Sequence, residues 1–350
     1  MAATCACTRR TVKIAAGNGP CRLRISVSTG SAMVRTAGAV YKRAAMPSRL
    51  LLKALAGPRF ALPLLIVGGI VISFSGIFVK LSEVGPSATG FYRMMLALPV
   101  LWLWQAMEQR HSDVPPREPA SRGDWWRLML PGLFLGADLV VWHWGLQLTS
   151  VANATVLGNS APIFVTLAGW LFFHERFGGK FLAGLALAVT GTVMLVGASA
   201  NFGLTNLIGD GLGVLAGILY AAYLISLKSV RAQFTTARVM TASAVSAALV
   251  CLVAAVVANE NVIVHTWRGI AILCGLAWMS HVLGQSLIAG ALAHLPASFS
   301  SVTLLINPLS TSLLAWLILG QALGPMQAAG GAVLLLGILL ARFDRGKRSG

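Results

Sequence analysis

The strongest constraint on this chain is its long stretches without charge. Residues 269–341 contain no Asp, Glu, Lys or Arg, and at about 20 residues per crossing this run is long enough for about three membrane spans. Over the whole chain, 57% of residues are hydrophobic and 11% are charged, against about a quarter charged in a typical soluble domain. The sequence therefore predicts a polytopic membrane protein. Its spans should be helical, because lipid leaves unpaired backbone groups without partners and the alternation typical of a membrane barrel is absent.

Ten transmembrane helices are predicted from the apolar runs and the residues that interrupt them. Pro86, Pro296 and Pro325 stand near the starts of helices, where a missing N–H costs little. Residues 108–125 form the only long hydrophilic connection between apolar runs. The expected spans are 61–81, 87–107, 127–147, 151–172, 180–198, 209–228, 238–258, 268–290, 295–318 and 325–342.

The net charge of +17 comes largely from the ends and loops of the chain, and it does not indicate nucleic-acid binding. Residues 1–60 contain no Asp or Glu and are rich in Arg, Ser, Thr and Ala. We interpret this segment as a disordered basic leader without a place in the fold. Two origins are open for residues 1–45. Their composition resembles that of an organelle transit peptide, and the alternative is an upstream extension with the natural start at Met33 or Met46. The second reading is favoured because composition alone supports the first.

Outside the leader, Lys and Arg are divided very unevenly between alternate loops. One set of loops holds only Lys80 and Arg268, with Arg93 inside a helix. Because Lys and Arg concentrate on the cytoplasmic side, both termini are predicted to be cytoplasmic, including a basic tail at 343–350. We expect the protein to lie in a bacterial cytoplasmic (inner) membrane. The residues of the basic side are Arg110, Arg117, Arg122, Arg127, Arg176, Lys180, Lys228, Arg231, Arg238, Arg342, Arg345, Lys347 and Arg348.

The chain also contains an internal repeat. Residues 160–179 and 306–325 match with a constant offset, and the charged loop His174-Glu175-Arg176 becomes Gly320-Gln321-Ala322 in the second copy. Each copy has five predicted helices, so the second enters the membrane upside down and its loop faces outside, where Lys and Arg are disfavoured. We expect two inverted five-helix repeats, at 61–198 and 208–342. The matched pairs are Pro162 with Pro308, Leu167 with Leu313, Trp170 with Trp316, Leu171 with Leu317, Gly178 with Gly324, Gly184 with Gly330 and Gly191 with Gly337.

These two copies resemble the EamA-type repeat of the drug/metabolite transporter superfamily. The segments FYRMM at 91–95 and GDGLGVLAGILYAAYLISLK at 209–228 resemble its second and sixth helices. The resemblance covers about 61–342 and implies a ten-helix bundle that moves small metabolites, often exporting amino acids. Where such repeats commonly end the fourth and ninth helices with Glu, the second copy here has Gln321.

Asp138 is the principal candidate for substrate or proton recognition. It lies near the middle of the third predicted helix on a face shared with Trp142, and an ionisable residue at such depth costs about 2.5–3.5 kcal/mol on insertion scales. Trp142 would then form an aromatic wall. The alternative is a structural ion pair with Arg93, which lies at similar depth in the second helix. Arg93 itself could bind a substrate carboxylate, neutralise Asp138 or extend toward the outer surface.

Further polar residues lie inside apolar helices. His143 and His281 could contact protons or substrate, although a lone histidine in an apolar helix is more often a satisfied core residue. Gln285 lies one turn after His281. The alternative for the amide and hydroxyl side chains is hydrogen bonding between helices. The remaining candidates for the pathway are Asn159, Tyr220 and Asn307, with Tyr223, Thr303, Ser310 and Thr311 on the same helices.

Enzyme and ATP-binding motifs are absent from the sequence, and no catalytic, metal or cofactor residues are predicted. We therefore expect a secondary active transporter, not an enzyme, that exports small metabolites by alternating access. Its cavity should be lined by helices 1, 3, 4, 6, 8 and 9, with helices 5 and 10 at the periphery. Its partners would be a small-molecule substrate and the lipid bilayer, and proton coupling and a homodimer stay open. The alternatives are a multi-pass enzyme acting on lipid-linked substrates and a membrane scaffold that transports nothing.

Overall fold

The computed structural model describes residues 57–111, 117–149, 151–197, 207–319 and 324–343, and all the regular elements among them are helices. These helices belong to one compact unit, residues 53–350. The leader up to residue 56, the loop Gly320-Gln321-Ala322 and the tail from residue 344 lie outside the described residues. The expectations for those three segments therefore stay predictions.

The prediction of an all-α polytopic membrane protein is confirmed. Eight helical segments among the described residues are long and apolar enough to cross a membrane, and Gly179–Leu195 is a shorter apolar helix. Each of these nine coincides with one of the ten expected spans. The eight are Pro58–Lys80, Arg122–Leu148, Ala154–Phe172, Leu207–Arg231, Thr236–Val257, Trp267–Leu292, Ala297–Leu314 and Pro325–Phe343.

The expectation of one continuous helix over 87–107 was wrong. The structure divides this segment into α5 (Pro86–Met95) and α6 (Leu98–His111). Pro99 explains the division, because it has no N–H to donate to the carbonyl of Met95 and its ring crowds that carbonyl. Neither half alone is as long as the other spans.

Two further breaks occur at matching places in the two repeats. The fourth expected span consists of α8 (Val151–Gly158) and α9 (Ala161–Phe172), and the ninth of α15 (Ala297–Thr303) and α16 (Ile306–Leu319). Each break lies just before a proline, Pro162 or Pro308, which removes one helical hydrogen bond and disfavours helix at the preceding residue. The matched prolines thus give both repeats a bend beside the centre of the bundle.

Other interruptions have no counterpart in the opposite repeat. The first span, after a short turn at Pro58–Phe60 (η1), is α3 (Ala61–Ser73) and α4 (Ser75–Lys80), whereas its counterpart α11 (Leu207–Arg231) is continuous. At the break, the Ser73 hydroxyl donates to the Gly69 carbonyl at 2.9 Å, a local bond that competes with regular helix. The eighth span runs through α13 (Trp267–Gly275), a π-helical stretch η3 (Leu276–Gln285) and α14 (Ser286–Leu292).

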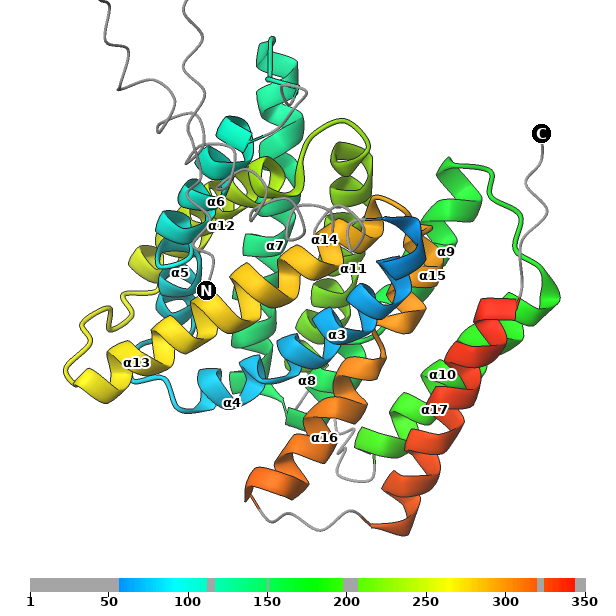
Figure 1. The fold of residues 1–350 in the computed structure, drawn as a ribbon. Helices are drawn as coiled ribbons and strands as arrows, with labels where there is room; N and C mark the ends of the chain where they lie inside the picture. Colours follow the sequence, from blue (N-terminus) through cyan, green and yellow to red (C-terminus); the bar gives the residue numbers. More distant parts are fainter. Residues whose placement is uncertain (1–56, 112–116, 150, 198–206, 320–323, 344–350) are drawn as a thin grey trace, which may run out of the picture. The chain divides into compact units, whose positions relative to one another are not determined.

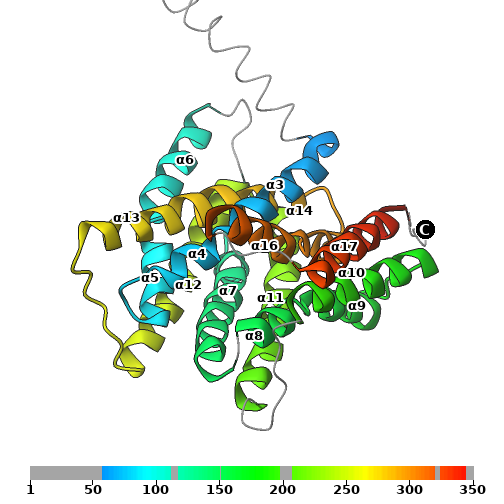
Figure 2. The same ribbon diagram turned by 90° about the horizontal axis from the view of Figure 1, so that it is seen from below.

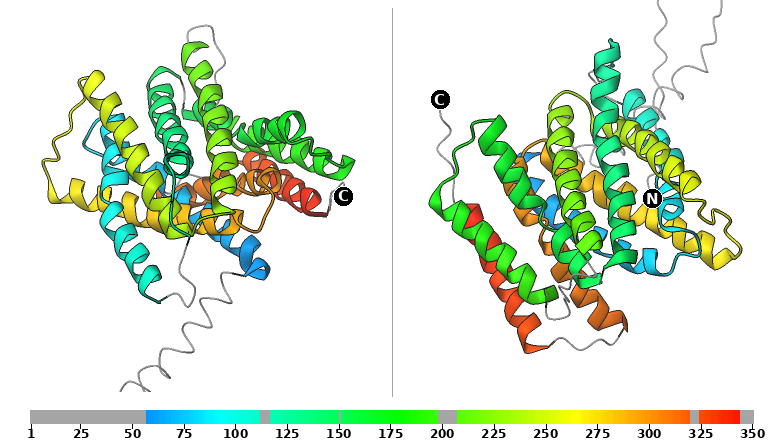
Figure 3. Two further views of the ribbon diagram at one scale, coloured as in Figure 1. Left: turned by 90° about the horizontal axis from the view of Figure 1, so that it is seen from above. Right: turned by 180° about the vertical axis from the view of Figure 1, so that it is seen from behind.

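The helices pack into two central groups and an outer pair. Viewed from above and behind, α7 (Arg122–Leu148) lies between α11 and α12 (Thr236–Val257) (Figure 3). On the other side, α3 packs against η3, α14 and α16 (Figure 1). The outer pair is α10 (Gly179–Gly197) and α17 (Pro325–Phe343), which lie side by side at one edge (Figures 1 and 2).

The outer pair is built on very close backbone contact. A Cβ atom added to Gly191 would lie 2.3 Å from the Leu334 amide nitrogen, and one added to Gly337 would lie 2.4 Å from that of Ala188. Glycine is the residue that permits this approach, as in small-residue contacts between membrane helices. These are the fifth and tenth expected spans, and they lie at the periphery as predicted.

Candidate functional site

A cavity of about 710 Å³ lies between the two central groups of helices. Its walls come from α3, α4, α7, α8, α9, α11, η3, α14, α15 and α16, which are the six spans expected to line it, and also from α5. Lys80 and Gln147, both exposed, lie at the end where the cavity reaches the surface. A mostly apolar cavity with a few polar groups is the usual form of a small-molecule site.

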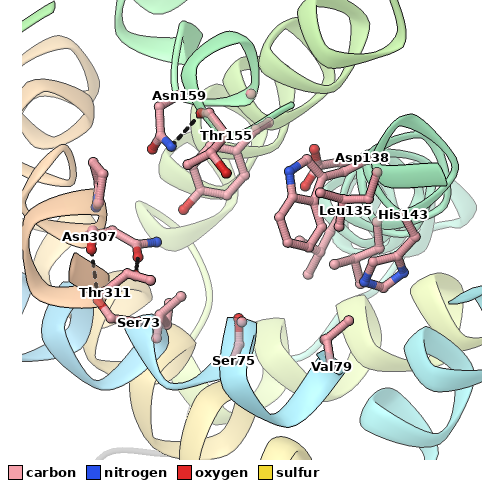
Figure 4. Close-up of a pocket in the computed structure, with 18 of the residues that line it drawn as sticks. Ser73, Ser75, Val79, Leu135, Asp138, His143, Thr155, Asn159, Asn307 and Thr311 are labelled. Atoms are coloured by element: carbon pink, nitrogen blue, oxygen red, sulfur yellow. Dashed lines mark hydrogen bonds between the residues drawn. The ribbon is translucent and has the colours of Figure 1, made fainter. Parts of the chain in front are cut away.

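Asp138 is on α7 and faces this cavity, with Leu135 and Leu139 on the same wall (Figure 4). Among the residues that the structure describes, its carboxylate accepts no hydrogen bond, and no basic nitrogen lies within 4.0 Å. A carboxylate in apolar surroundings favours a cationic partner or a proton. The side chain is thus available to a cationic group that enters the cavity.

Arg93, on α5, also lines the cavity but does not form the alternative ion pair with Asp138 at contact distance. One of its terminal nitrogens donates to the Ser280 hydroxyl at 3.0 Å. Its Nε has no hydrogen-bond partner among the described residues, although the side chain is only 5% exposed. A buried guanidinium with donors to spare suits an anionic group, because an unpaired charge is costly to bury.

The two candidate histidines lie in different environments. His143 lines the cavity beside Trp142, with ring centroids 5.3 Å apart. His281 is fully buried on η3 and is not part of the cavity wall. Among the described residues, the ring nitrogens of both histidines lack a hydrogen-bond partner. The structure therefore brings His143, but not His281, to the site.

Amide and hydroxyl groups form the wall opposite Asp138 (Figure 4). The Asn159 amide donates to the Thr155 carbonyl at 2.7 Å. On the neighbouring helix, the Thr311 hydroxyl donates to the Asn307 side-chain oxygen at 3.2 Å. These bonds use only part of each side chain's capacity, so hydrogen-bonding atoms remain for a polar ligand.

Tyr220 and Gln285 complete the set of predicted residues in the cavity wall. The Gln285 side-chain oxygen accepts a hydrogen bond from the buried Tyr223 hydroxyl at 3.1 Å, and Tyr223 packs against Tyr220. Of the two tyrosines expected near the pathway, Tyr220 is therefore the one that lines it. Of the three hydroxyl residues predicted on the ninth span, Thr311 lines the cavity whereas Thr303 and Ser310 do not.

Sequence reasoning missed several polar residues of the cavity. Ser73 and Ser75 flank the break in the first span, and Ser73 donates to the Asn307 carbonyl at 3.2 Å. The signal was present as Ser73-Phe74-Ser75-Gly76 inside an otherwise apolar run, since Ser and Gly together often mark a bend. Gln147 and Lys80 both lie at the mouth of the cavity, and nothing in the sequence indicates that they share this position.

Metal binding was not predicted, and among the described residues no group of three or more His, Cys, Asp and Glu side chains could hold a metal ion. The chemistry of the cavity wall suits the recognition of a ligand. One carboxylate, one guanidinium and several neutral hydrogen-bonding groups face a common space, with indole and phenol rings between them.

The two repeats match a known protein family. The sequence profile of the EamA-like transporter family matches residues 59–197 and again residues 207–343. The chain belongs to this family. EamA membership and the helical architecture together support a multi-pass membrane transporter, which implies a small-molecule substrate and a lipid environment.

Similar proteins come from several organisms. An uncharacterized transporter of Archaeoglobus fulgidus is 26% identical over 80% of this chain and 94% of its own length. The protein named pseudopaline exporter CntI of Pseudomonas aeruginosa is 23% identical over 63% of this chain and 76% of its own. A solved protein structure superposes with a TM-score of 0.69 at 16% identity, covering 80% of this chain and 96% of the other, so the two share a fold.

Proposed function

We propose that this protein is a secondary active transporter that exports small metabolites, such as amino acids, across a bacterial cytoplasmic membrane. The observation that carries the proposal is Asp138, an acid that has no partner among the described residues, inside a cavity between membrane-spanning helices. Ionisable groups at such depth are costly and usually mark a substrate or ion pathway. Export as the direction is supported by the relative that is named an exporter.

The proposed roles follow from the chemistry of the cavity wall. Asp138 would bind the amino group of a substrate or carry a proton, and Arg93 would bind an anionic group such as a carboxylate. Trp142 would provide an aromatic face for the cation. The remaining groups would orient the substrate by hydrogen bonds: His143, Asn159, Tyr220, Gln285 and Asn307. His281 stays a candidate for proton transfer only, since it lies behind the wall.

The proposed mechanism is alternating access between two inverted repeats, with boundaries at 61–198 and 208–342. The two central groups of helices would rock against each other and expose the cavity to each side in turn. Energy would come from a substrate or ion gradient. The distribution of Lys and Arg supports cytoplasmic termini and an opening of the cavity, beside Lys80, toward the outside.

Uptake into everted membrane vesicles tests this proposal. Vesicles with the wild-type protein, the Asp138→Asn variant or no protein would receive a mixed pool of amino acids and small metabolites. Mass spectrometry would follow uptake with and without an imposed proton gradient. We expect selective uptake by the wild type that responds to the gradient and is lost in Asp138→Asn.

Other results would change the proposal in defined ways. Uptake without gradient dependence would indicate a facilitator and remove proton carriage from Asp138. If no compound is taken up, the proposal of transport fails for this pool. A membrane enzyme and a scaffold that transports nothing are then the remaining candidates. Release of product from lipid-linked substrates would then indicate a membrane enzyme, and its absence a scaffold.

A further inference from the structure

The cavity is closed at the end opposite Lys80. Its floor is formed by Leu224 of α11, Ile288 of α14 and Ser301 of α15, which are all 2% exposed or less. At the other end, Lys80 and Gln147 are exposed. The structure therefore shows one open and one closed end, and the residues just beyond the floor must hold the closed end together.

Two basic side chains bridge the helices one turn beyond this floor. The Lys228 ammonium, on α11, donates to the Leu292 carbonyl at 3.1 Å and to the Leu295 carbonyl at 2.5 Å. The Arg231 Nε, at the last residue of α11, donates to the Ala289 carbonyl at 3.1 Å, and another of its nitrogens donates to the Phe234 carbonyl. Three of these four acceptors lie at or just after the end of α14.

The end of α14 suits cations for a physical reason. The last carbonyls of a helix have no partner inside it and carry a partial negative charge. Lys228 and Arg231 satisfy these carbonyls with charge-assisted bonds, which are about twice as strong as neutral ones. A helix end in a membrane protein has few other partners, so these contacts should contribute substantially to closing the bundle.

The three bonds to Ala289, Leu292 and Leu295 cross from one central group of helices to the other. The helix that carries both cations, α11, packs with α7, α8 and α9, whereas α14 packs with α3 and η3. Just above, the neutral hydrogen bond between Tyr223 and Gln285 makes the same crossing. An opening of the cavity at this end that separates α11 from α14 would break the bonds that both cations make to the end of α14.

We propose that Lys228 and Arg231 form a latch that locks the cavity at the end opposite Lys80 and must release for each transport cycle. This proposal rests on the proposed alternating access. It gives two residues outside the cavity a direct role in setting which end is open.

The inverted repeat supplies a counterpart for this latch. Lys80 ends the first span as Lys228 lies near the end of the sixth, and the two are separated by the same offset as the starts of the two family matches, residues 59 and 207. Lys80 is exposed at the open mouth and has no described partner, and Gln147, near the end of α7, lines the same mouth. In the opposite state Lys80 would dock on the carbonyls at the end of α7, as Lys228 now docks on α14.

Chemical labelling of the floor tests the latch without any substrate. All five cysteines are replaced in the full-length protein, and Ser301→Cys is introduced as the reporter. A membrane-impermeant maleimide is added to everted and to right-side-out vesicles. We expect Lys228→Met or Arg231→Met to raise labelling in everted vesicles about tenfold and to lower it in right-side-out vesicles. Lys228→Gln should change each labelling rate in the same sense as Lys228→Met does, but by a smaller factor. Lys228→Arg should label like the parent.

The matched control is Lys180→Met, which removes an exposed basic residue from the same end of the bundle. Folded protein is selected by gel filtration before rates are compared. Unchanged labelling in Lys228→Met, Arg231→Met and Lys228→Gln would overturn the latch, as would an equal rise in Lys180→Met. Lys80→Met should shift labelling the opposite way, and combined with Lys228→Met it should restore rates close to those of the parent.

Failure of the latch and failure of the proposed function are distinguishable. Labelling depends only on which end is open, whereas uptake depends on a substrate. If the protein transports substrate but all its variants label at the same rate, the latch is refuted and the proposed function is not. A protein that labels as expected but takes up no compound would keep the latch and refute the proposed substrate class.

Discussion

The third span of each repeat offers the most informative comparison in this molecule. Both spans begin alike. The Ser121 hydroxyl accepts a hydrogen bond from the Asp124 amide at 3.1 Å at the start of α7, and the Thr266 hydroxyl accepts one from the Gly269 amide at 2.9 Å at the start of α13. Each is a side-chain cap on the first turn, where backbone N–H groups lack helical partners.

The two spans differ in their middle parts. The first, α7, carries Asp138 and His143 into the cavity. The second passes through the π-helical η3, where Ser280 and His281 are fully buried and Gln285 alone faces the cavity. The equivalent helices thus differ in what they contribute: α7 places a carboxylate in the cavity wall, while η3 bonds Arg93 and Tyr223. Function in an inverted repeat need not be symmetric.

Removing the acid from α7 should have the largest effect. We expect Asp138→Asn to lower the rate of transport about a hundredfold, because loss of one partner of a buried charge pair typically costs about 2–5 kcal/mol. Thermal unfolding in detergent should be unchanged or shifted upward, since the substitution leaves no partner unpaired among the described residues. A wild-type rate and pH dependence in Asp138→Asn would show that the acid is structural. The third spans of the two repeats would then not differ in carrying an acid needed for transport.

Removing the brace from η3 should have the next largest effect. Ser280→Ala deletes the hydroxyl that holds the Arg93 guanidinium and leaves a buried charged donor with one partner fewer. We expect KM for an anionic substrate to rise about tenfold, with little change in maximal rate. Ser75→Ala, which removes a hydroxyl from the cavity wall and leaves Ser280 in place, is the matched control. An equal change in KM for a substrate without an anionic group would contradict a role through Arg93.

The two histidines should respond differently to the same substitution. His143→Leu removes a polar group from the cavity wall, and we expect about a fivefold loss of transport. His281→Leu replaces a side chain outside the cavity wall, so transport should persist, and because its nitrogens, like those of His143, have no described partner, the melting temperature should hold or rise. Transport rates and melting temperatures, measured for both variants, test this difference. Loss of transport in His281→Leu would instead indicate a proton path behind the cavity wall.

The caps should show the smallest and most similar effects. Ser121→Ala and Thr266→Ala should each lower the free energy of unfolding by about 1 kcal/mol and change transport less than twofold. Thr266 also bonds Glu83, so its loss should be slightly larger, and Thr266→Ser should restore most of it. If one cap variant proves far more destabilising than the other, the starts of the two spans are not equivalent.

The membrane architecture could be predicted from sequence because its physical cause is local. A run such as 269–341 without charge can be accommodated in lipid only as helices, and the alternation of Lys and Arg between loops does not depend on packing. The matched prolines Pro162 and Pro308 likewise predicted corresponding helices. The division at Pro99 was missed, although a proline inside an apolar run is a local signal of a break.

The composition of the cavity wall could be predicted only in part. Most candidates were chosen because polar residues are rare in apolar helices, and eight of the nine line the cavity, whereas His281 does not. His143 and His281 look alike in sequence, and nothing local separates them. The contacts of Arg93 with Ser280 and of Lys228 with Leu292 join residues far apart in the chain.

Sequence alone therefore determined that this chain is a bundle of membrane helices built from two related halves. The tertiary structure decided which face of each helix meets the cavity. The physical reason is that lipid and protein interior are both apolar, so a membrane helix need not show the polar and apolar faces that orient a soluble one. A π-helical stretch then turns the side chains of η3 out of the regular register. Only packing could place Asp138 inside the cavity and His281 behind its wall.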